Sequence, residues 1–405
     1  MSTTTKQSAV LIQQESEFGA HNYHPLDVVL CRGEGPYLWD VDGKRYMDFL
    51  AAYSAVNQGH NHPKIVEALV KQANTLALTS RAFRNDKFPP LLVKLNQMTG
   101  FDKALLMNSG AEAVETAIKA ARKWGYDHKN IEEGKAEIIV MDGNFHGRTT
   151  TIIGFSTDDT TVKGFGPFSP GFHIAEFGNL EAVKSLINEN TCAILVEPVQ
   201  GEGGVVIPPK GFLKELRALT EREDILMFCD EIQSGLGRTG KMFAFEHEGI
   251  RPDGVTVGKA LSGGVYPVSA FLANEKVMKV FTPGTHGSTY GGNPLACAVA
   301  NAALDVLVDE DLVNQSATLG EYMTDRLRKI DSPHIKEVRG LGLWAGVELH
   351  ESAGGARRFC ERLQEEGMLC KETHTHTIRL APPLVVTKEQ LDWALDLFER
   401  VLKEG

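Results

Sequence analysis

Residues 224–259 read DILMFCDEIQSGLGRTGKMFAFEHEGIRPDGVTVGK and hold two short apolar runs that each lead to a charged residue. The first run, ILMFC, leads to Asp230, and the second, GVTV, leads to Lys259. Apolar runs of this length are typical of strands buried on both faces, as in a parallel sheet covered by helices. The runs KALLMNSG, AEIIVMDG and CAILVEP repeat the pattern, with helix-like segments such as AEAVETAIKAARKWG beside them. The sequence therefore predicts an α/β fold with a parallel sheet.

Polar residues stand where these runs end. Ligands of parallel sheets bind beyond the carboxyl ends of the strands. We therefore expect the chemistry of the protein at this edge of the sheet, where the candidates are Asn108, Asp142, Glu197, Asp230 and Lys259.

The length of 405 residues favours two or three packed units. The N-terminal part contains short β-like pieces, such as GPYLWDVDGKRYMDF with its DG turn signal. After Tyr290 the chain turns helical and then ends in a mixed tail. We predict an N-terminal segment, 1–49, that joins a smaller domain, a large domain, 50–290, and a C-terminal part, 291–405, that completes the smaller domain.

Composition excludes several classes of function. The chain carries 53 acidic and 42 basic residues, a net charge of −11, without the basic clusters that nucleic-acid binding needs. No apolar stretch approaches the ~18 residues of a membrane span, and the first twenty residues do not resemble a targeting peptide. Six cysteines without a C-x-x-C pair, and histidines without an accompanying ligand set, predict no metal site. We expect a cytoplasmic protein.

The turn ALLMNSGAEAVET at 104–116 runs from a strand into a helix with small first residues. Free backbone N–H groups and the positive end of the helix dipole make such a turn a phosphate site, with Ser109, Gly110 and Ala111 as candidates. The same stretch also fits an ordinary helix start, with Asn108 or Ser109 as the N-cap.

The strand exit at Asp230 suits a flat ring. In extended backbone Asp230 and Ile232 point the same way, so that a carboxylate could reach a ring nitrogen while an apolar side chain covers one face. Gln233 could reach a ring oxygen. Lys259 fits either a surface lysine with a buried stem or a nucleophile whose pKa falls in a pocket of small residues. Together with the phosphate turn, these are the groups that a protein uses to bind pyridoxal phosphate.

The run MFCDEIQSGLGRTGKMFAFEHEGIRPDGVTVGKALSGG, residues 227–264, resembles the signature of class III aminotransferases. The resemblance covers nearly the whole chain. It places the ring-nitrogen acid at Asp230 and the Schiff-base lysine at Lys259. It implies the fold type I of pyridoxal-phosphate-dependent transferases: a large domain with a mostly parallel seven-stranded sheet flanked by helices, and a smaller α+β domain built from both chain ends.

Two further segments match the family in order. FHGR at 145–148 looks like the family's ring-stacking aromatic, Phe145, followed by a substrate-carboxylate arginine, Arg148. GSTYGGNP at 287–294 resembles the cofactor-binding segment that holds Ser288 and gives a phosphate contact, Thr289, to the neighbouring subunit's cofactor. The resemblance therefore implies an obligate homodimer with shared active sites.

Within the family, the segments HNYHP, LAAYSAVNQGH, LTSRAF, GFGPFSPGF, GEGGVV and IRLAPPL resemble the members that act on ornithine. This resemblance implies transfer of the δ-amino group of L-ornithine to 2-oxoglutarate, giving glutamate 5-semialdehyde and L-glutamate. It implies that Tyr23, Tyr53 and Arg148 hold ornithine, and that Glu202 pairs with Arg379. The sequence departs from the eukaryotic ornithine enzymes at His146, where they carry tryptophan and other class III enzymes carry histidine.

Other functions remain as alternatives. GLGRTG at 235–240 fits the dinucleotide pattern G-x-G-x-x-G, and GLGLWA at 340–345 fits it loosely, but neither lies in the required strand-to-helix context. A pyridoxal-phosphate-binding scaffold would not need the whole set of reactive residues. Within the family, acetylornithine, 4-aminobutyrate and lysine are alternative substrates. Tyr23 and Tyr53 favour a free amino-acid head group over an acylated one.

Overall fold

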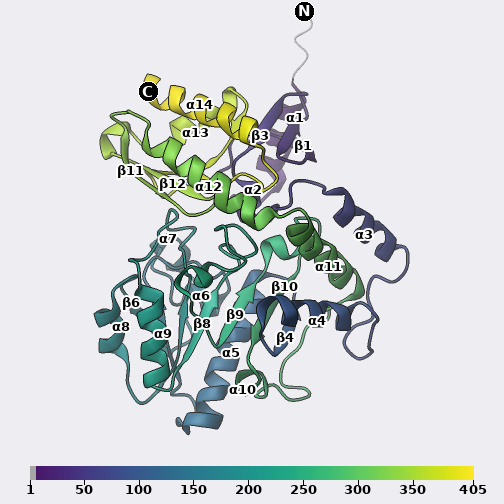
Figure 1. Ribbon diagram of the computed structural model, residues 1–405, viewed down its shortest axis with the longest axis vertical. Coiled ribbons are helices and arrows are strands. Elements are labelled where there is room, and N and C mark those ends of the chain that lie inside the picture. Colours follow the sequence, from purple (N-terminus) through teal and green to yellow (C-terminus); the bar gives the residue numbers. More distant parts are fainter. Residues whose placement is uncertain (1–5) are drawn as a thin grey trace, which may run out of the picture.

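The computed structural model describes residues 6–405, so residues 1–5 of the predicted N-terminal segment lie outside the described residues (Figure 1). Its largest sheet has seven strands within these residues, in the order β4-β10-β9-β8-β7-β5-β6. β10 is antiparallel to both of its neighbours, and the strands from β9 to β6 are parallel. The prediction of a mostly parallel seven-stranded sheet is confirmed. The strands are β4 (Lys103–Met107), β5 (Glu137–Met141), β6 (Phe172–Ala175), β7 (Thr191–Val196), β8 (Leu226–Asp230), β9 (Gly254–Val257) and β10 (Ser269–Ala273).

The central strands are apolar along their whole length because helices cover both faces. Every residue of β7, β8 and β9 is buried. Alternate residues face opposite sides: Ile194 belongs to the core shared with α9 (Phe212–Arg222), and Leu195 belongs to the core beneath α5 (Gly110–Lys129). Such two-sided burial produces the continuous apolar runs of the sequence.

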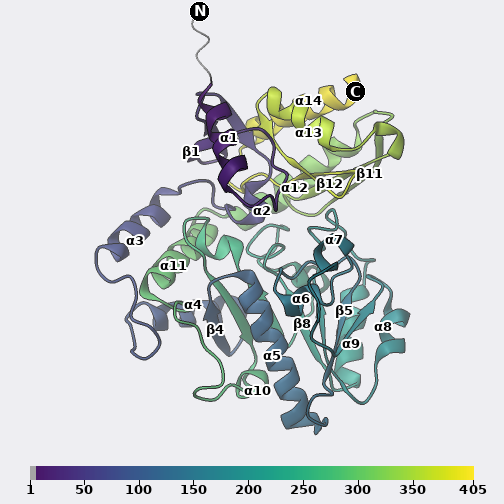
Figure 2. The ribbon, with the colours of Figure 1, turned by 180° about the vertical axis from the view of Figure 1, so that it is seen from behind.

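The smaller domain joins both ends of the chain. Its first sheet has the order β1-β2-β3-β13, in which β13 (Met368–Leu369) pairs in parallel with β3 (Arg45–Asp48). Both described chain ends therefore lie at the same end of the molecule (Figures 1 and 2). The other strands are β1 (Leu30–Glu34) and β2 (Tyr37–Asp40), and, in a second sheet of order β11-β12-β15-β14, β11 (Ile335–Gly340), β12 (Ala345–Leu349), β14 (Lys371–Thr373) and β15 (Thr377–Leu380).

The boundaries at 49/50 and 290/291 stay predictions. The helix α11 (Pro294–Asp309), which begins the predicted C-terminal part, packs against α3 (Pro63–Ala73) and α4 (Phe88–Thr99). The remaining helices and helical turns are α1 (Gln7–Phe18), α2 (Ala51–Ser54), α6 (Thr150–Ile153), α7 (Asp159–Val162), α8 (Leu180–Leu186), α10 (Glu275–Met278), α12 (Leu312–Arg328), α13 (Arg357–Glu365), α14 (Lys388–Glu404), η1 (Ala244–Glu248), η2 (Lys259–Ser262) and η3 (Glu351–Ala353).

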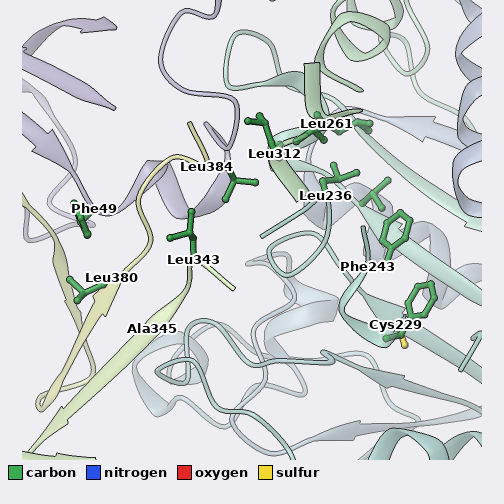
Figure 3. Packing of buried hydrophobic residues seen from close by; sticks show 14 of the residues in the cluster. Phe49, Cys229, Leu236, Phe243, Leu261, Leu312, Leu343, Ala345, Leu380 and Leu384 are labelled. Carbon is green, nitrogen blue, oxygen red and sulfur yellow. The ribbon is translucent and has the colours of Figure 1, made fainter. Parts of the chain in front are cut away.

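One apolar core runs through both domains. Figure 3 shows Leu236, from the turn after β8, and Leu261, from η2 after β9, near Leu312, Leu343 and Leu384 from the C-terminal part. This continuity fixes the two domains against each other, and so it fixes groups of the smaller domain beside the edge of the large sheet.

No helix in residues 6–405 combines the length and the apolar character that crossing a membrane requires. The same residues contain no cluster of three or more His, Cys, Asp or Glu side chains placed to hold a metal ion.

Candidate active site

A cavity lies at the carboxyl ends of the sheet strands, as the sequence predicts. Glu197, Asp230 and Lys259 line it, from the ends of β7, β8 and β9. Of the other two strand-end candidates, Asn108 stands beside the start of α5, and Asp142 is exposed and does not line the cavity. The full lining is Gly110, Ala111, Phe145, His146, Gly147, Glu197, Val199, Asp230, Ile232, Gln233, Ser234 and Lys259.

Lys259 begins the helical turn η2 and has a left-handed backbone, with φ 43°. Its side chain faces the cavity rather than open solvent. Burial lowers the pKa of its ammonium below the ordinary value, although the carboxylates of Glu202 and Asp230 act in the opposite direction. A lowered pKa leaves a larger fraction of the amine uncharged, and the uncharged amine is the form that acts as nucleophile and base.

Asp230 is buried and held by three hydrogen bonds. Its Oδ1 accepts from the backbone N–H of Ile232 at 3.1 Å and from the hydroxyl of Thr256 at 2.9 Å. Its Oδ2 lies 2.7 Å from Nδ1 of His146. These contacts fix the plane of the carboxylate at the cavity wall.

His146 was not predicted as a site residue, but the structure places it in the cavity. Its side chain is buried, and its Nε2 has no hydrogen-bond partner among the described residues. Burial alone would lower the pKa of the imidazole, but the hydrogen bond to Asp230 and its charge outweigh burial and raise the pKa. The adjacent Phe145 was a candidate, so the motif was visible, but nothing in the sequence indicates a contact between His146 and Asp230.

Glu197 is a second buried acid in the cavity. Its Oε2 accepts the backbone N–H of Phe145 at 3.0 Å, and so it holds the loop that carries Phe145 and His146. Burial raises the pKa of its carboxyl to about 7. The strand-end rule placed Glu197 near the site but assigned it no role.

The three residues predicted to bind a phosphate lie at the start of α5. Ser109 is the N-cap of α5: its hydroxyl accepts the N–H of Glu112, and its own N–H donates to the Glu112 carboxylate at 2.7 Å. Gly110 and Ala111 line the cavity at the first helical positions, where N–H groups have no acceptor within the helix. A Cβ on Gly110 would lie 3.1 Å from Cδ1 of Ile232, so the slot between them is narrow.

Ser288 and Thr289 lie on a loop beside this turn. The Ser288 hydroxyl accepts a hydrogen bond from the Asn108 amide at 3.0 Å. Thr289 is exposed and does not line the cavity of its own subunit.

The structure also brings together Arg379 and Glu202. Nη1 of Arg379 lies 2.6 Å from Oε1 of Glu202, but the N–H is not directed at the oxygen, so the contact is an ion pair without a well-formed hydrogen bond. Cζ of Arg379 lies 5.0 Å from the ring centre of Tyr53. Glu202 lines a second cavity that shares Phe145 and His146 with the first.

The other predicted substrate residues lie nearer to the surface. Arg148 is exposed, with Cζ 5.7 Å from the ring centre of Phe145. Tyr23 is 78% exposed and shares an apolar groove with Tyr53. Gln233, predicted to reach a ring oxygen, lines the first cavity.

The donor set fits pyridoxal phosphate. Free N–H groups at Gly110 and Ala111 suit a phosphate. The narrow slot beside Ile232 suits a flat ring, a buried carboxylate at Asp230 suits a protonated ring nitrogen, and Lys259 offers an amine in the same cavity.

Comparison with known proteins identifies the class. The sequence matches the aminotransferase class-III family over residues 18–402, and the chain belongs to this family. Pyridoxal phosphate is therefore its cofactor. An ornithine aminotransferase of Geobacillus sp. (strain WCH70) is 55% identical over 401 residues, 99% of each chain.

Solved structures of aminotransferases have the same fold as this chain. The ornithine aminotransferase of Toxoplasma gondii ME49 superposes with a TM-score of 0.97 at 42% identity, covering 98% of this chain and 96% of that one. An acetylornithine aminotransferase of Elizabethkingia anophelis has a TM-score of 0.90 at 49% identity, covering 99% of this chain and 100% of that one.

Proposed function

We propose that this class III aminotransferase transfers the δ-amino group of L-ornithine to 2-oxoglutarate, giving glutamate 5-semialdehyde and L-glutamate. The observation that carries the proposal is the Arg379–Glu202 pair at 2.6 Å beside the lysine cavity. The guanidinium of Arg379 could stay paired with Glu202 while ornithine is bound, and could bind a carboxylate when glutamate or 2-oxoglutarate is bound.

Bound pyridoxal phosphate would supply an electron sink and a carrier for the amino group. Gly110 and Ala111 would hold its phosphate, and Asp230 would keep a proton on its ring nitrogen. Lys259 would take the proton from the substrate carbon that bears the reacting amine. A positioned proton carrier of this kind contributes typically ~10²–10⁴ in rate.

The two substrates need different charges at the same site. Ornithine must present its δ-amine, with its α-carboxylate on Arg148. An unmasked Arg379 would attract that carboxylate and turn the α-amine toward the cofactor, so Glu202 has to occupy it. Glutamate brings two carboxylates: its far carboxylate would take Arg148, and its α-carboxylate would replace Glu202 on Arg379, where planar bidentate geometry favours a carboxylate.

Half-reactions test this switch. Glu202→Ala should slow the single-turnover reaction with ornithine, raise reaction at its α-amine, and leave or improve the reaction with glutamate. Glu202→Gln keeps the shape and removes the charge, so it is the matched control for packing. Equal losses in both half-reactions would reduce the pair to a structural salt bridge.

The second candidate substrate is N-acetylornithine, because the similar enzyme of Elizabethkingia anophelis carries that name. Tyr23 and Tyr53 favour a head group with a free ammonium and carboxylate. Turnover of ornithine, N-acetylornithine and 4-aminobutyrate with 2-oxoglutarate under the same conditions separates the candidates. Faster turnover of the acylated substrate would contradict the proposal.

We also propose that the enzyme is an obligate homodimer of the cytoplasm. Thr289 is exposed, outside its own cavity, which supports a contact with the cofactor of a neighbouring subunit. Mixed dimers of Lys259→Ala and Thr289→Ala chains should regain one intact site, since each site takes the lysine from one chain and the threonine from the other. Failure to regain activity in mixed dimers would contradict the shared site.

A further inference from the structure

Arg238, in the turn GLGRTG, is completely buried, and within residues 6–405 its hydrogen-bond acceptors are two backbone carbonyls and an amide oxygen rather than a carboxylate. Its Nη1 donates to the carbonyl oxygens of Leu343 at 2.8 Å and Pro382 at 2.7 Å, and its Nη2 donates to Oδ1 of Asn57 at 2.6 Å. Burial lowers the pKa of the guanidinium to about 9, against the charge of Asp48. A buried cation without a paired acid is costly, so these three hydrogen bonds are needed to hold it.

Two of the three acceptors lie beside β15, which carries Arg379, and beside its neighbour β12. Pro382 lies just beyond the end of β15, which contains Arg379. Leu343 lies just before β12, where Gly346 pairs with Arg379. One side chain from the large domain therefore holds both strands at the end where Ala345 pairs with Leu380.

The backbone packing at this junction leaves little freedom. Gly342 has φ 61°, and a Cβ there would lie 2.5 Å from the carbonyl oxygen of Arg238. Leu236, Leu343 and Leu384 surround the junction with apolar side chains (Figure 3). The two glycine-rich stretches that fit a dinucleotide pattern thus meet each other at the domain junction, and glycine is required there for close backbone approach.

We propose that Arg238 is a positioning residue for Arg379: it fixes the strand pair of the smaller domain, and with it the guanidinium of Arg379, relative to Lys259 on the large sheet. Arg238 lines neither cavity and acts only through the strands that it holds. The proposal rests on the proposed function, in which Arg379 takes a carboxylate of the dicarboxylate substrate.

Binding of glutarate to the holoenzyme tests the proposal without catalysis. Glutarate has two carboxylates but no amino or oxo group, so its dissociation constant, measured by calorimetry, reports binding at Arg148 and Arg379 without any reaction; a change confined to Arg379 shows against a constant contribution from Arg148. Arg238→Lys retains a charge but cannot reproduce the planar fork that serves three acceptors. We expect the dissociation constant for glutarate to rise about tenfold to a hundredfold, the loss that follows when a charge-assisted hydrogen bond to Arg379 is weakened.

Arg217→Lys is the matched control. Arg217 pairs with Asp253 at 2.6 Å, before the start of β9 and therefore at the opposite edge of the sheet. Both variants should unfold at lower temperature, but Arg217→Lys should bind glutarate like the wild type. If Arg238→Lys does not yield folded holoenzyme, Asn57→Ala removes one of the three hydrogen bonds and should raise the same constant by a smaller factor.

The outcomes distinguish the proposal from the function on which it rests. If Arg379→Gln leaves glutarate binding unchanged, the proposed role of Arg379 fails. If Arg379→Gln weakens glutarate binding but Arg238→Lys and Asn57→Ala do not, the positioning role of Arg238 is overturned and only a contribution to stability is left.

Discussion

The short turn α2, Ala51–Ser54, places backbone strain next to Arg379. All four residues have positive φ, between 46° and 71°, and none is glycine. Left-handed backbone costs an L-residue about 1–2 kcal/mol. Contacts on both sides hold the turn: Oδ1 of Asp48 accepts the N–H of Ala51 at 3.0 Å, and the N–H of Val56 donates to the carbonyl oxygen of Ala51 at 3.1 Å. Strain of this kind persists where the surroundings fix the backbone, often at functional sites.

Ala52→Gly relieves this strain at one position. The Ala52 side chain is exposed, so its removal loses little packing. Relief of about 1–2 kcal/mol is offset by the extra entropy of glycine in the unfolded chain, about 0.5–1 kcal/mol. We therefore expect the free energy of unfolding to stay constant or rise by about 1 kcal/mol. Ala317→Gly, at an exposed position in the right-handed helix α12, should instead lower it by about 1 kcal/mol.

Thermal unfolding at one fixed cofactor concentration measures both variants, because ligand binding shifts the midpoint. A second readout is the KM for ornithine. We expect it to rise in Ala52→Gly, since a freer turn no longer holds Tyr53 in one place. The reasoning is refuted if Ala52→Gly loses as much stability as Ala317→Gly. An unchanged KM would leave the strain as a feature of folding alone.

Three further predictions concern the cavity. Lys259→Ala should keep the fold and lose transamination, and borohydride reduction of the wild type followed by peptide mapping should label the peptide with Lys259 and no other. Asp230→Ala should lose pyridoxal phosphate on dialysis, which absorbance measures; retention equal to the wild type would contradict its role at the ring nitrogen. The carboxyl of Glu197 has a pKa of about 7 in the folded protein, against an ordinary value of 4.5. Relative to ionised Glu197, the protonated group therefore adds about 3 kcal/mol to the free energy of unfolding, in full below pH 4.5. This contribution is lost as the pH rises through 7. The free energy of unfolding of Glu197→Gln in urea, without cofactor, should therefore match that of the wild type best at about pH 4.5 or below and exceed it by pH 8. A difference that stays constant with pH would contradict the raised pKa.

The fold was predictable where burial leaves a simple pattern. Strands such as β7 and β8 are buried on both faces, so their sequences are continuous apolar runs. The reversed direction of β10 leaves no such mark, because an apolar run has no direction. The pairing of β13 with β3 joins residues from opposite ends of the chain; the sequence predicted one smaller domain from both ends but not which strands pair.

The position of the site on the sheet was predictable, but the hydrogen bonds between its side chains were not. The rule that ligands bind at the carboxyl ends of parallel strands brought Glu197, Asp230 and Lys259 together without knowledge of side-chain directions. The contact of His146 with Asp230 depends on the path of the loop after β5, which local sequence does not determine. The hydrogen bonds of Arg238 likewise depend on how the two domains dock.

The charges of the cavity show why these contacts matter for chemistry. The hydrogen bond and charge of Asp230 raise the pKa of His146 against the effect of burial, and burial raises the pKa of Glu197 nearby to about 7. Burial lowers the pKa of Lys259 at the same time. Because the pKa of Glu197 is raised toward neutrality and that of Lys259 is lowered from its ordinary value, the free-energy difference between the protonation states of each group is smaller near pH 7. Lys259 could then exchange a proton with a substrate carbon without creating a strongly disfavoured charge, and Asp230, held by three hydrogen bonds, would keep a fixed orientation toward the ring nitrogen of bound pyridoxal phosphate.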